Sequence, residues 1–179
     1  DGRVVLSDLT MTDRDIRAIG RICIVACGSS YHVGMVGKYA LERMLRRPVE
    51  VCLASEFRYS DPLVGDGDLV IVISQSGETL DTIAVATTKA YSTQMAVLHL
   101  LGLYFGDVMG TLDYETYSAM VRGLEVLPTQ MEEVLSRTEP IREVAKWLAG
   151  EEDVFFLGRN LDYALSLEGS LKLKEISYI

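Results

Sequence analysis

The stretch RICIVACGSS, Arg21–Ser30, decides the predicted fold. Its first part is a short, continuous apolar run, which is typical of a strand covered on both faces in a parallel sheet. It runs into a loop of small residues, ACGSS. The next residues, SYHVGMVGKYALERMLRRP, predict a helix that ends before Pro48. Its expected apolar side carries Tyr31, Met35, Tyr39 and Met44.

The same pattern returns twice further along the chain. PVEVCLASEF (48–57) and DLVIVISQSG (68–77) each begin with an apolar run of strand length. Strands separated by a helix or a long connection imply right-handed crossovers. We therefore predict an α/β fold, a doubly wound sheet with central parallel strands and helices on both faces.

The second half of the sequence predicts a series of helices, and after them the strand–loop–helix pattern of residues 21–47 occurs again. The expected helices cover 87–108, 113–127, 128–137 and 139–150, with Pro128 starting the third of them. DVFFLGRN (153–160) then predicts a strand and loop, and 161–178 predict a helix. Gly158 lies 130 positions after Gly28, at the matching place. We interpret 1–20 as a lead-in, 21–150 as a first domain with a helical connection, and 151–179 as the truncated beginning of a second copy.

Composition narrows the class of protein. The chain has 179 residues, of which 49% are hydrophobic and 24% charged, as expected for a packed globular protein. A net charge of −9 argues against a nucleic-acid partner. Three cysteines without a CxxC pair argue against a disulfide framework and a zinc site, and favour a reducing, cytoplasmic setting. Neither a membrane-spanning run nor a secretion signal is expected.

Two of the predicted strands end in loops that could bind an anion. In an open parallel sheet, ligands bind beyond the carboxyl ends of the strands. Ser74, Ser76 and Thr79 can donate hydrogen bonds, and a helix starting near Thr79 adds free backbone N–H groups. These features favour a phosphate or sugar-phosphate site. A helix cap with a turn is the alternative, which the acidic residues Glu78 and Asp81 favour. No GxxxxGK[ST] motif of nucleotide-binding loops is present.

Other residues could act as catalysts or metal ligands, but each can also be explained by a structural role. Cys27 follows a strand, where a nucleophile could lie, but a small buried hydrophobe is the alternative role. His32 and His99 lack metal-ligand spacing. Lys172 and Glu175 are three residues apart on one predicted helix. That spacing fits a surface ion pair or a proton-transfer pair, and both interpretations stay open.

Several of these motifs resemble one family. VACGSSYHVG, VEVCLASEFRY, VIVISQSGETLDT, VATTKAYSTQ and FFLGRNLDYALSLEGSLKLKEISYI are similar to the isomerase region of the glutamine–fructose-6-phosphate aminotransferases. That resemblance implies two sugar-isomerase (SIS) domains, each a doubly wound α/β unit. It also implies synthesis of glucosamine 6-phosphate from fructose 6-phosphate and ammonia, a separate glutaminase domain, a homodimer, and neither a metal nor an organic cofactor.

The resemblance assigns roles to residues of this chain. Glu175 corresponds to the general base that moves a proton between C1 and C2 of the sugar, and Lys172 to a neighbouring substrate-contacting lysine. The resemblance places the phosphate on Ser74, Gln75, Ser76 and Thr79. It places the sugar against Cys27, Gly28, Ser29 and Ser30, with further contacts from Val85 and Thr87.

Departures from the family pattern accompany this resemblance. Family members carry a helix, a strand and a loop between the residues matching Ala84 and Val85, which are adjacent here. We interpret this junction as a missing segment. The family's ring-opening histidine, a C-terminal lysine and the glutaminase domain are also absent from this sequence. Two alternatives remain, a non-catalytic sugar-phosphate sensor and another SIS isomerase or deglycase. The sensor has no need of Glu175.

Overall fold

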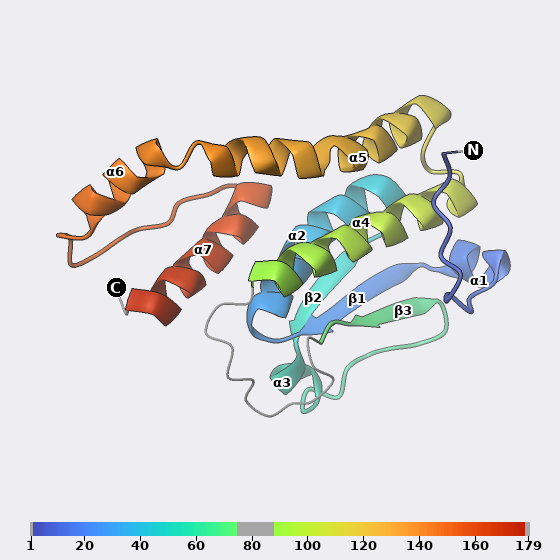
Figure 1. Cartoon of the computed structure of the whole chain (residues 1–179). Coiled ribbons are helices and arrows are strands. Elements are labelled where there is room, and N and C mark those ends of the chain that lie inside the picture. The colour runs from blue at the N-terminus through green and yellow to red at the C-terminus, as the bar shows by residue number, and fades with distance from the viewer. Residues whose placement is uncertain (1, 75–87, 178–179) are drawn as a thin grey trace.

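The structure, a computed structural model, describes residues 2–74 and 88–177. Figure 1 shows a small sheet next to two long crossing helices, with a helical arm that leads away from it and returns. Of the residues to which the sequence assigned a role, Gln75, Ser76, Thr79, Val85 and Thr87 lie outside the described residues.

Three parallel strands form the sheet, as predicted. Strand β1 (Arg21–Ala26) is central, between β2 (Val49–Leu53) and β3 (Asp68–Val72). In the register, Val25 pairs with Cys52 on one side and with Val72 on the other. All three strands therefore end at the same edge of the sheet, which places the loops after β1 and β3 next to each other.

One face of the sheet carries the core. Helix α2 (Gly28–Leu45) crosses β1 and β2, and α4 (Thr88–Met109) packs along α2. Helix α2 approaches the sheet closely at Gly34, because a Cβ on this residue would lie 3.0 Å from both Ile24 Cγ2 on β1 and Val51 Cγ1 on β2. The core on this face is built from fully buried side chains, among them Ile16, Ile22, Ile24, Leu41, Leu45, Leu103 and Phe105.

The side of α2 that faces the core differs in part from the prediction. Met44 is buried as expected, whereas Tyr31, Met35 and Tyr39 are only half-buried. The buried side also contains the glycines 34 and 37, which make the close approach possible. The prediction missed these positions because glycine carries no hydrophobic signal of its own.

Short helices flank the sheet. Helix α1 (Asp13–Ala18) starts at a capping box, in which Thr12 Oγ1 accepts from the Asp15 N–H and the Asp15 carboxylate accepts from the Thr12 N–H. Helix α3 (Ala54–Phe57) directly follows β2. Ile16 carries α1 into the core, where it is fully buried.

The second face of the sheet is covered differently from the first. Cys23 and Cys52 meet there, with their Sγ atoms 3.6 Å apart as free thiols. Phe57 and residues 60–64, before β3, line a pocket against this face. The helices predicted for this face are not found among the described residues, and Val72 is 70% exposed.

A bidentate ion pair between Arg21 and Asp68 lies on this face, at the start of β1. Arg21 Nε donates to Asp68 Oδ1 at 3.1 Å and Arg21 Nη2 donates to Asp68 Oδ2 at 2.7 Å. The Gly65 N–H also donates to Oδ2. These bonds favour the ionised form, so they hold the pKa of Asp68 below its ordinary value of 3.8, the Arg21 hydrogen bond having the largest effect.

This lowered pKa predicts a pH-dependent contribution to stability. The contribution is complete above the pKa of the unfolded state and is lost as the pH falls through the lower pKa of the folded state. We expect Asp68→Asn to be less stable than the wild type near neutral pH, and the difference in free energy of unfolding to shrink below about pH 4. Urea denaturation of both proteins across this range measures it. A difference that stayed constant with pH would contradict the assignment.

The C-terminal half is helical, with two corrections to the prediction. Helix α5 (Tyr114–Ser136) runs through Pro128, so the break predicted there is wrong. Proline removes one backbone hydrogen bond, but the turns on either side continue the helix. Helix α6 (Glu139–Leu148) and α7 (Leu161–Ser177) follow, as predicted. The strand predicted within 153–160 is not formed, because no described strand pairs with it.

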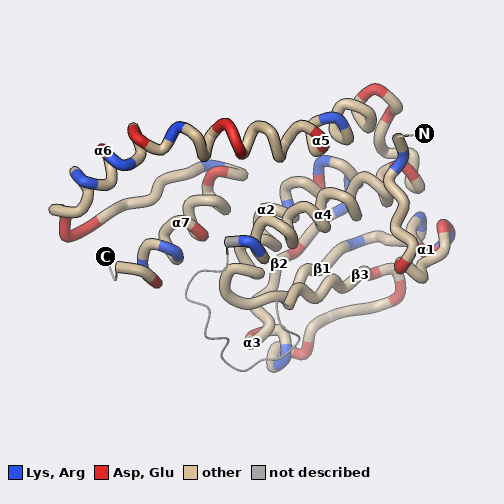
Figure 2. The backbone as a smooth tube through the Cα atoms, in the orientation of Figure 1, with Lys and Arg blue, Asp and Glu red and all other residues tan. Residues whose placement is uncertain are grey.

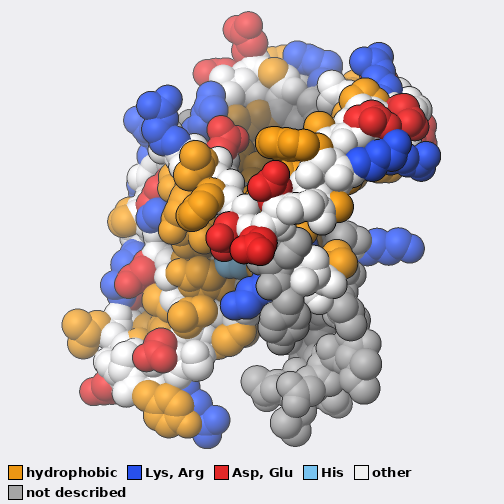
Figure 3. Space-filling model, turned by 90° about the vertical axis from the view of Figure 1, so that its left-hand side faces the viewer, with side chains coloured by type: hydrophobic (Ala, Val, Ile, Leu, Met, Phe, Trp, Pro, Cys, Tyr) orange, Lys and Arg blue, Asp and Glu red, His pale blue; other side chains and the backbone are white. Residues whose placement is uncertain are grey.

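Charges and apolar groups are distributed unevenly over these helices. Figure 2 shows α4 nearly without charged residues along its length, whereas α5 and α6 carry charges of both signs. On the side viewed in Figure 3, apolar side chains gather on the surface. Trp147, Phe155 and Leu157 are each more than two-thirds exposed. A surface of this kind suits burial against other protein.

Within residues 2–74 and 88–177, no helix combines the length and the apolar character that crossing a bilayer requires.

Candidate functional site

The loop after β1 becomes the start of α2. The predicted loop extended to Ser30, but the helix already begins at Gly28, which has a φ of +55°. Glycine adopts this left-handed conformation without strain. Cys27 and Gly28 are exposed, and Ser29 and Ser30 are half-buried. The first turn contains no acidic residue, so its free N–H groups face outward without a competing carboxylate.

Ser74 lies at the same edge of the sheet. It follows Ile73, whose N–H donates to the Val25 carbonyl at 3.0 Å and so extends the pairing of β3 with β1. Ser74 is exposed. The described residues of the predicted phosphate and sugar site are thus Ser74 together with Cys27, Gly28, Ser29 and Ser30.

A hydrogen bond joins the start of α2 to the start of α4. Ser30 Oγ donates to Gln94 Oε1 at 3.1 Å. The hydroxyl of Tyr91, one turn earlier on α4, is buried. Burial, and after it the charge of Glu168, raises the pKa of Tyr91 to about 12. The N-terminal parts of the two helices are thus joined by a hydrogen bond beside a buried hydroxyl.

Helix α7 brings the predicted proton-transfer pair together. Lys172 Nζ donates to Glu175 Oε2 at 2.5 Å and lies 3.6 Å from Glu168 Oε1. The Lys172 side chain is 16% exposed, and that of Glu175 is 32% exposed. The pair is therefore a real ion pair on one helix face, and it is more shielded than an ordinary surface pair.

Glu168 is a residue that the sequence analysis missed. It is 7% exposed, and its Oε2 lies 2.7 Å from His32 Nδ1 on α2. The helical spacing of Glu168, Lys172 and Glu175, by four and then three residues, could have shown that they share one face. The partnership with His32 has no sequence signal, because the two residues are 136 positions apart.

The contact between α7 and α2 places these groups close to the first loop. Helix α7 packs against α2, as Figure 1 shows near the start of α2. His32 follows Gly28 by four residues, which is about 6 Å along the helix axis. Glu168 of α7 therefore contacts α2 about one helical turn from Gly28, one of the predicted sugar-binding residues.

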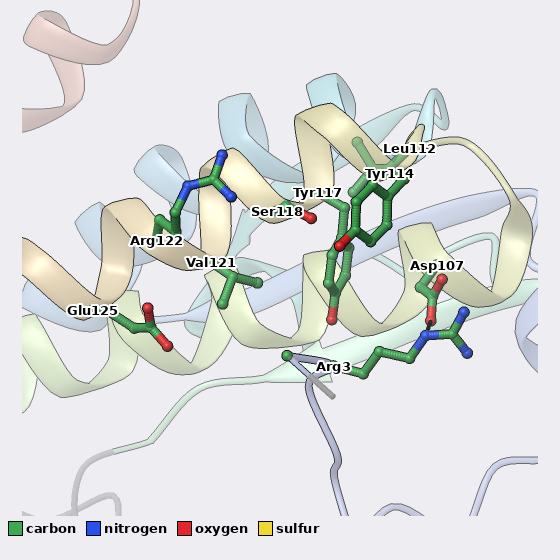
Figure 4. Close-up of a pocket in the computed structure, with 10 residues that line it drawn as sticks. Arg3, Asp107, Leu112, Tyr114, Tyr117, Ser118, Val121, Arg122 and Glu125 are labelled. Atoms are coloured by element: carbon green, nitrogen blue, oxygen red, sulfur yellow. Dashed lines mark ion pairs between the residues drawn. The ribbon is translucent and has the colours of Figure 1, made fainter.

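Figure 4 shows a pocket at the other end of α4, about 280 Å³ in volume. Arg3 forms an ion pair with Asp107 there at 3.8 Å, and the Val4 N–H donates to the Tyr117 hydroxyl at 2.7 Å. Asp107 is sixteen residues from Tyr91 on the same helix, about 24 Å along its axis. These contacts fix the N-terminal segment on α4 and α5, away from the candidate site.

Comparison with known proteins identifies the family. Residues 15–100 match the SIS domain model. The chain is 42% identical over 218 residues to a protein of Symbiobacterium thermophilum named glutamine–fructose-6-phosphate aminotransferase [isomerizing], covering 99% of this chain and 36% of that protein. A protein of the same name from Mycobacterium tuberculosis is 37% identical, with 99% and 35% covered.

Solved structures agree with this result. The C-terminal domain of glucosamine-fructose-6-phosphate aminotransferase from Francisella tularensis has a TM-score of 0.91 and 31% identity, covering 100% of this chain and 61% of that chain. A putative phosphosugar isomerase from Bacillus subtilis, at 17% identity and a TM-score of 0.63, shares the fold; 90% of this chain and 62% of that one are covered.

The chain is shorter than the corresponding part of its relatives. It spans about 36% of the length of the Symbiobacterium protein. The alignment covers 218 positions against the 179 residues of this chain, so at least 39 aligned positions have no counterpart here. Residues 15–100 thus belong to the SIS-domain family, and the chain is related over nearly its whole length to the glutamine–fructose-6-phosphate aminotransferases.

Proposed function

We propose that this chain is the isomerase part of an aminotransferase that makes glucosamine 6-phosphate from fructose 6-phosphate and glutamine-derived ammonia. One observation carries the proposal. The Lys172–Glu175 ion pair lies on a helix packed against α2, and Lys172 also pairs with Glu168, which contacts His32 in the first part of α2. A sugar-phosphate sensor needs a binding site, but it does not need a carboxylate and an ammonium paired beside it.

The phosphate would bind at the carboxyl edge of the sheet. Ser74 supplies a hydroxyl there, and the first turn of α2 supplies backbone N–H groups and the positive end of the helix dipole. Gln75, Ser76 and Thr79 complete this phosphate site in the proposal, and Val85 and Thr87 contact the sugar. Cys27, Gly28, Ser29 and Ser30 would lie along the sugar.

Glu175 and Lys172 would carry the isomerisation. Ammonia adds to the C2 ketone of the open-chain sugar, and loss of water gives an imine. Glu175 removes a proton from C1 while the imine nitrogen gains one, which gives an enolamine. The proton held by Glu175 then returns to C2 while O1 loses its hydroxyl proton, so C2 carries an amino group and C1 becomes an aldehyde, with no net gain or loss of protons. A carboxylate suits this step because it accepts and returns one proton without leaving the site. Lys172, between two carboxylates, holds Glu175 and contacts the sugar hydroxyls.

The partners in the proposal follow from the relatives. Their name gives glutamine as the nitrogen donor, so a glutaminase domain would supply the ammonia. We further propose a cytoplasmic homodimer, which the exposed apolar side chains of the C-terminal third support.

We also propose that a segment is missing between Ala84 and Val85. The relatives' surplus of at least 39 aligned positions supports this, as does the exposure of Val72 on β3 at the second face of the sheet. In the proposed division, residues 21–150 form the first domain and residues 151–179 begin the second.

Ligand binding tests the proposal. We expect calorimetric titration with fructose 6-phosphate to show saturable binding, tighter than that of inorganic phosphate. Ser74→Ala should weaken it by about tenfold or more, because a hydrogen bond to a charged group is lost. Ser136→Ala is the matched control, since the Ser136 hydroxyl bonds only within α5, to the Glu133 carbonyl. Absence of saturable binding, or equal affinity for inorganic phosphate, would overturn the proposal.

A further inference from the structure

A buried carboxylate connects the two helices of the candidate site. Among residues 2–74 and 88–177, Glu168 is the one charged side chain that is fully buried, at 7% exposure. A buried charge is stable only when it is paired and hydrogen-bonded. The hydrogen-bond and ion-pair partners of Glu168 therefore determine the position of its carboxylate.

Both oxygens of Glu168 are engaged, each by a different helix. His32 Nδ1 on α2 lies 2.7 Å from Oε2, and Lys172 Nζ on α7 lies 3.6 Å from Oε1. An ionised carboxylate only accepts hydrogen bonds, so Nδ1 carries the proton in this contact. The His32 side chain is 15% exposed, which shields the bond from water.

The position of Lys172 depends on this bond. Lys172 lies between two carboxylates, those of Glu168 and Glu175. If Glu168 were released from His32, its carboxylate could turn toward Lys172 alone and draw the ammonium away from Glu175. The buried Tyr91 hydroxyl has no hydrogen-bond partner among the described residues, so a released Glu168 carboxylate could also accept a hydrogen bond from it.

We propose that His32 is a positioning residue, which holds Glu168 on α2 and thereby keeps Lys172 against Glu175. This inference rests on the function proposed above. It means that, within the packed contact of α2 with α7, this hydrogen bond sets where the carboxylate beside Lys172 lies. A general base gains rate only when it is held in the right geometry, and a misplacement of about 1 Å can cost about a hundredfold.

The test compares substitutions of His32 in the full-length protein that carries this sequence. We expect His32→Leu to lower kcat by about tenfold to a hundredfold and to change KM by less than about threefold. His32→Asn should restore most of the activity, because its amide N–H can take the place of Nδ1–H. His99→Leu is the matched control: the other histidine bonds only the Met95 carbonyl of its own helix, and its loss should leave kcat unchanged.

Each outcome decides the question. A folded His32→Leu protein with wild-type kcat would overturn the proposal, and so would a His32→Asn protein as impaired as His32→Leu. If His32→Leu does not fold, Glu168→Gln decides in its place: it keeps the shape but loses the charge that orders His32 and Lys172, and an unchanged kcat would overturn the proposal. Inactivity of the wild type toward fructose 6-phosphate would instead contradict the proposed function.

Discussion

Replacing Glu175 by glutamine is expected to abolish formation of glucosamine 6-phosphate by the full-length protein. General acid–base catalysis contributes about 10²- to 10⁴-fold, and a carboxamide cannot accept and return the proton. Glutamine keeps the size of the side chain and can still accept a hydrogen bond from Lys172, so the site should stay assembled. We therefore expect kcat to fall by this factor while the affinity for fructose 6-phosphate changes by less than about threefold.

The control for this substitution is another glutamate with the same local geometry. Glu143 pairs with Lys146 three residues later on α6, at 2.6 Å, with both side chains more than 60% exposed. Glu143→Gln should leave kcat unchanged, because an exposed pair of this kind contributes little. Rate measurements on both variants, with ammonia as the nitrogen source, separate the chemistry from the glutaminase step. A Glu175→Gln protein that kept its turnover would rule out the assigned role.

The second large effect is on stability, at the contact of α2 with α4. A Cβ on Gly37 would lie 2.3 Å from Leu98 Cδ1, and Leu98 is itself 2% exposed. Gly37→Val therefore has to push apart helices that are already close-packed. We expect the free energy of unfolding to fall by about 1–3 kcal/mol, the usual cost of overpacking a core.

Gly123 provides the matched comparison. It lies in α5, also within a helix, and a Cβ there would have nothing within 4 Å. Gly123→Val should change stability by no more than about 0.5 kcal/mol, as is usual for surface positions. Urea denaturation followed by circular dichroism measures both variants. Equal losses at the two positions would show that the contact of α2 with α4 does not set the cost.

The strands and their common edge could be predicted because their signal is local. Each strand is an apolar run of its own, and parallel pairing follows from the connections between them. From this edge, the positions of Cys27, Gly28 and Ser74 at one end of the sheet followed directly. The start of α2 was misplaced by a few residues, since a loop of glycine and serines also serves as a first helical turn.

The features that could not be predicted depend on contacts between residues that are far apart in the sequence. The apolar run in 153–160 has the composition of a strand but lacks a strand to pair with. Pro128 lies inside α5 although proline usually ends a helix. The bond between His32 and Glu168 exists only because α7 packs on α2, and no local pattern encodes that contact.

The most direct measurement of the central claim is product analysis of the full-length protein supplied with fructose 6-phosphate and ammonia. The account predicts glucosamine 6-phosphate as the product, identified by mass spectrometry and separated from its isomers by chromatography. Glucose 6-phosphate in its place would indicate an isomerase that uses no ammonia. Either that product or unchanged fructose 6-phosphate would contradict the account.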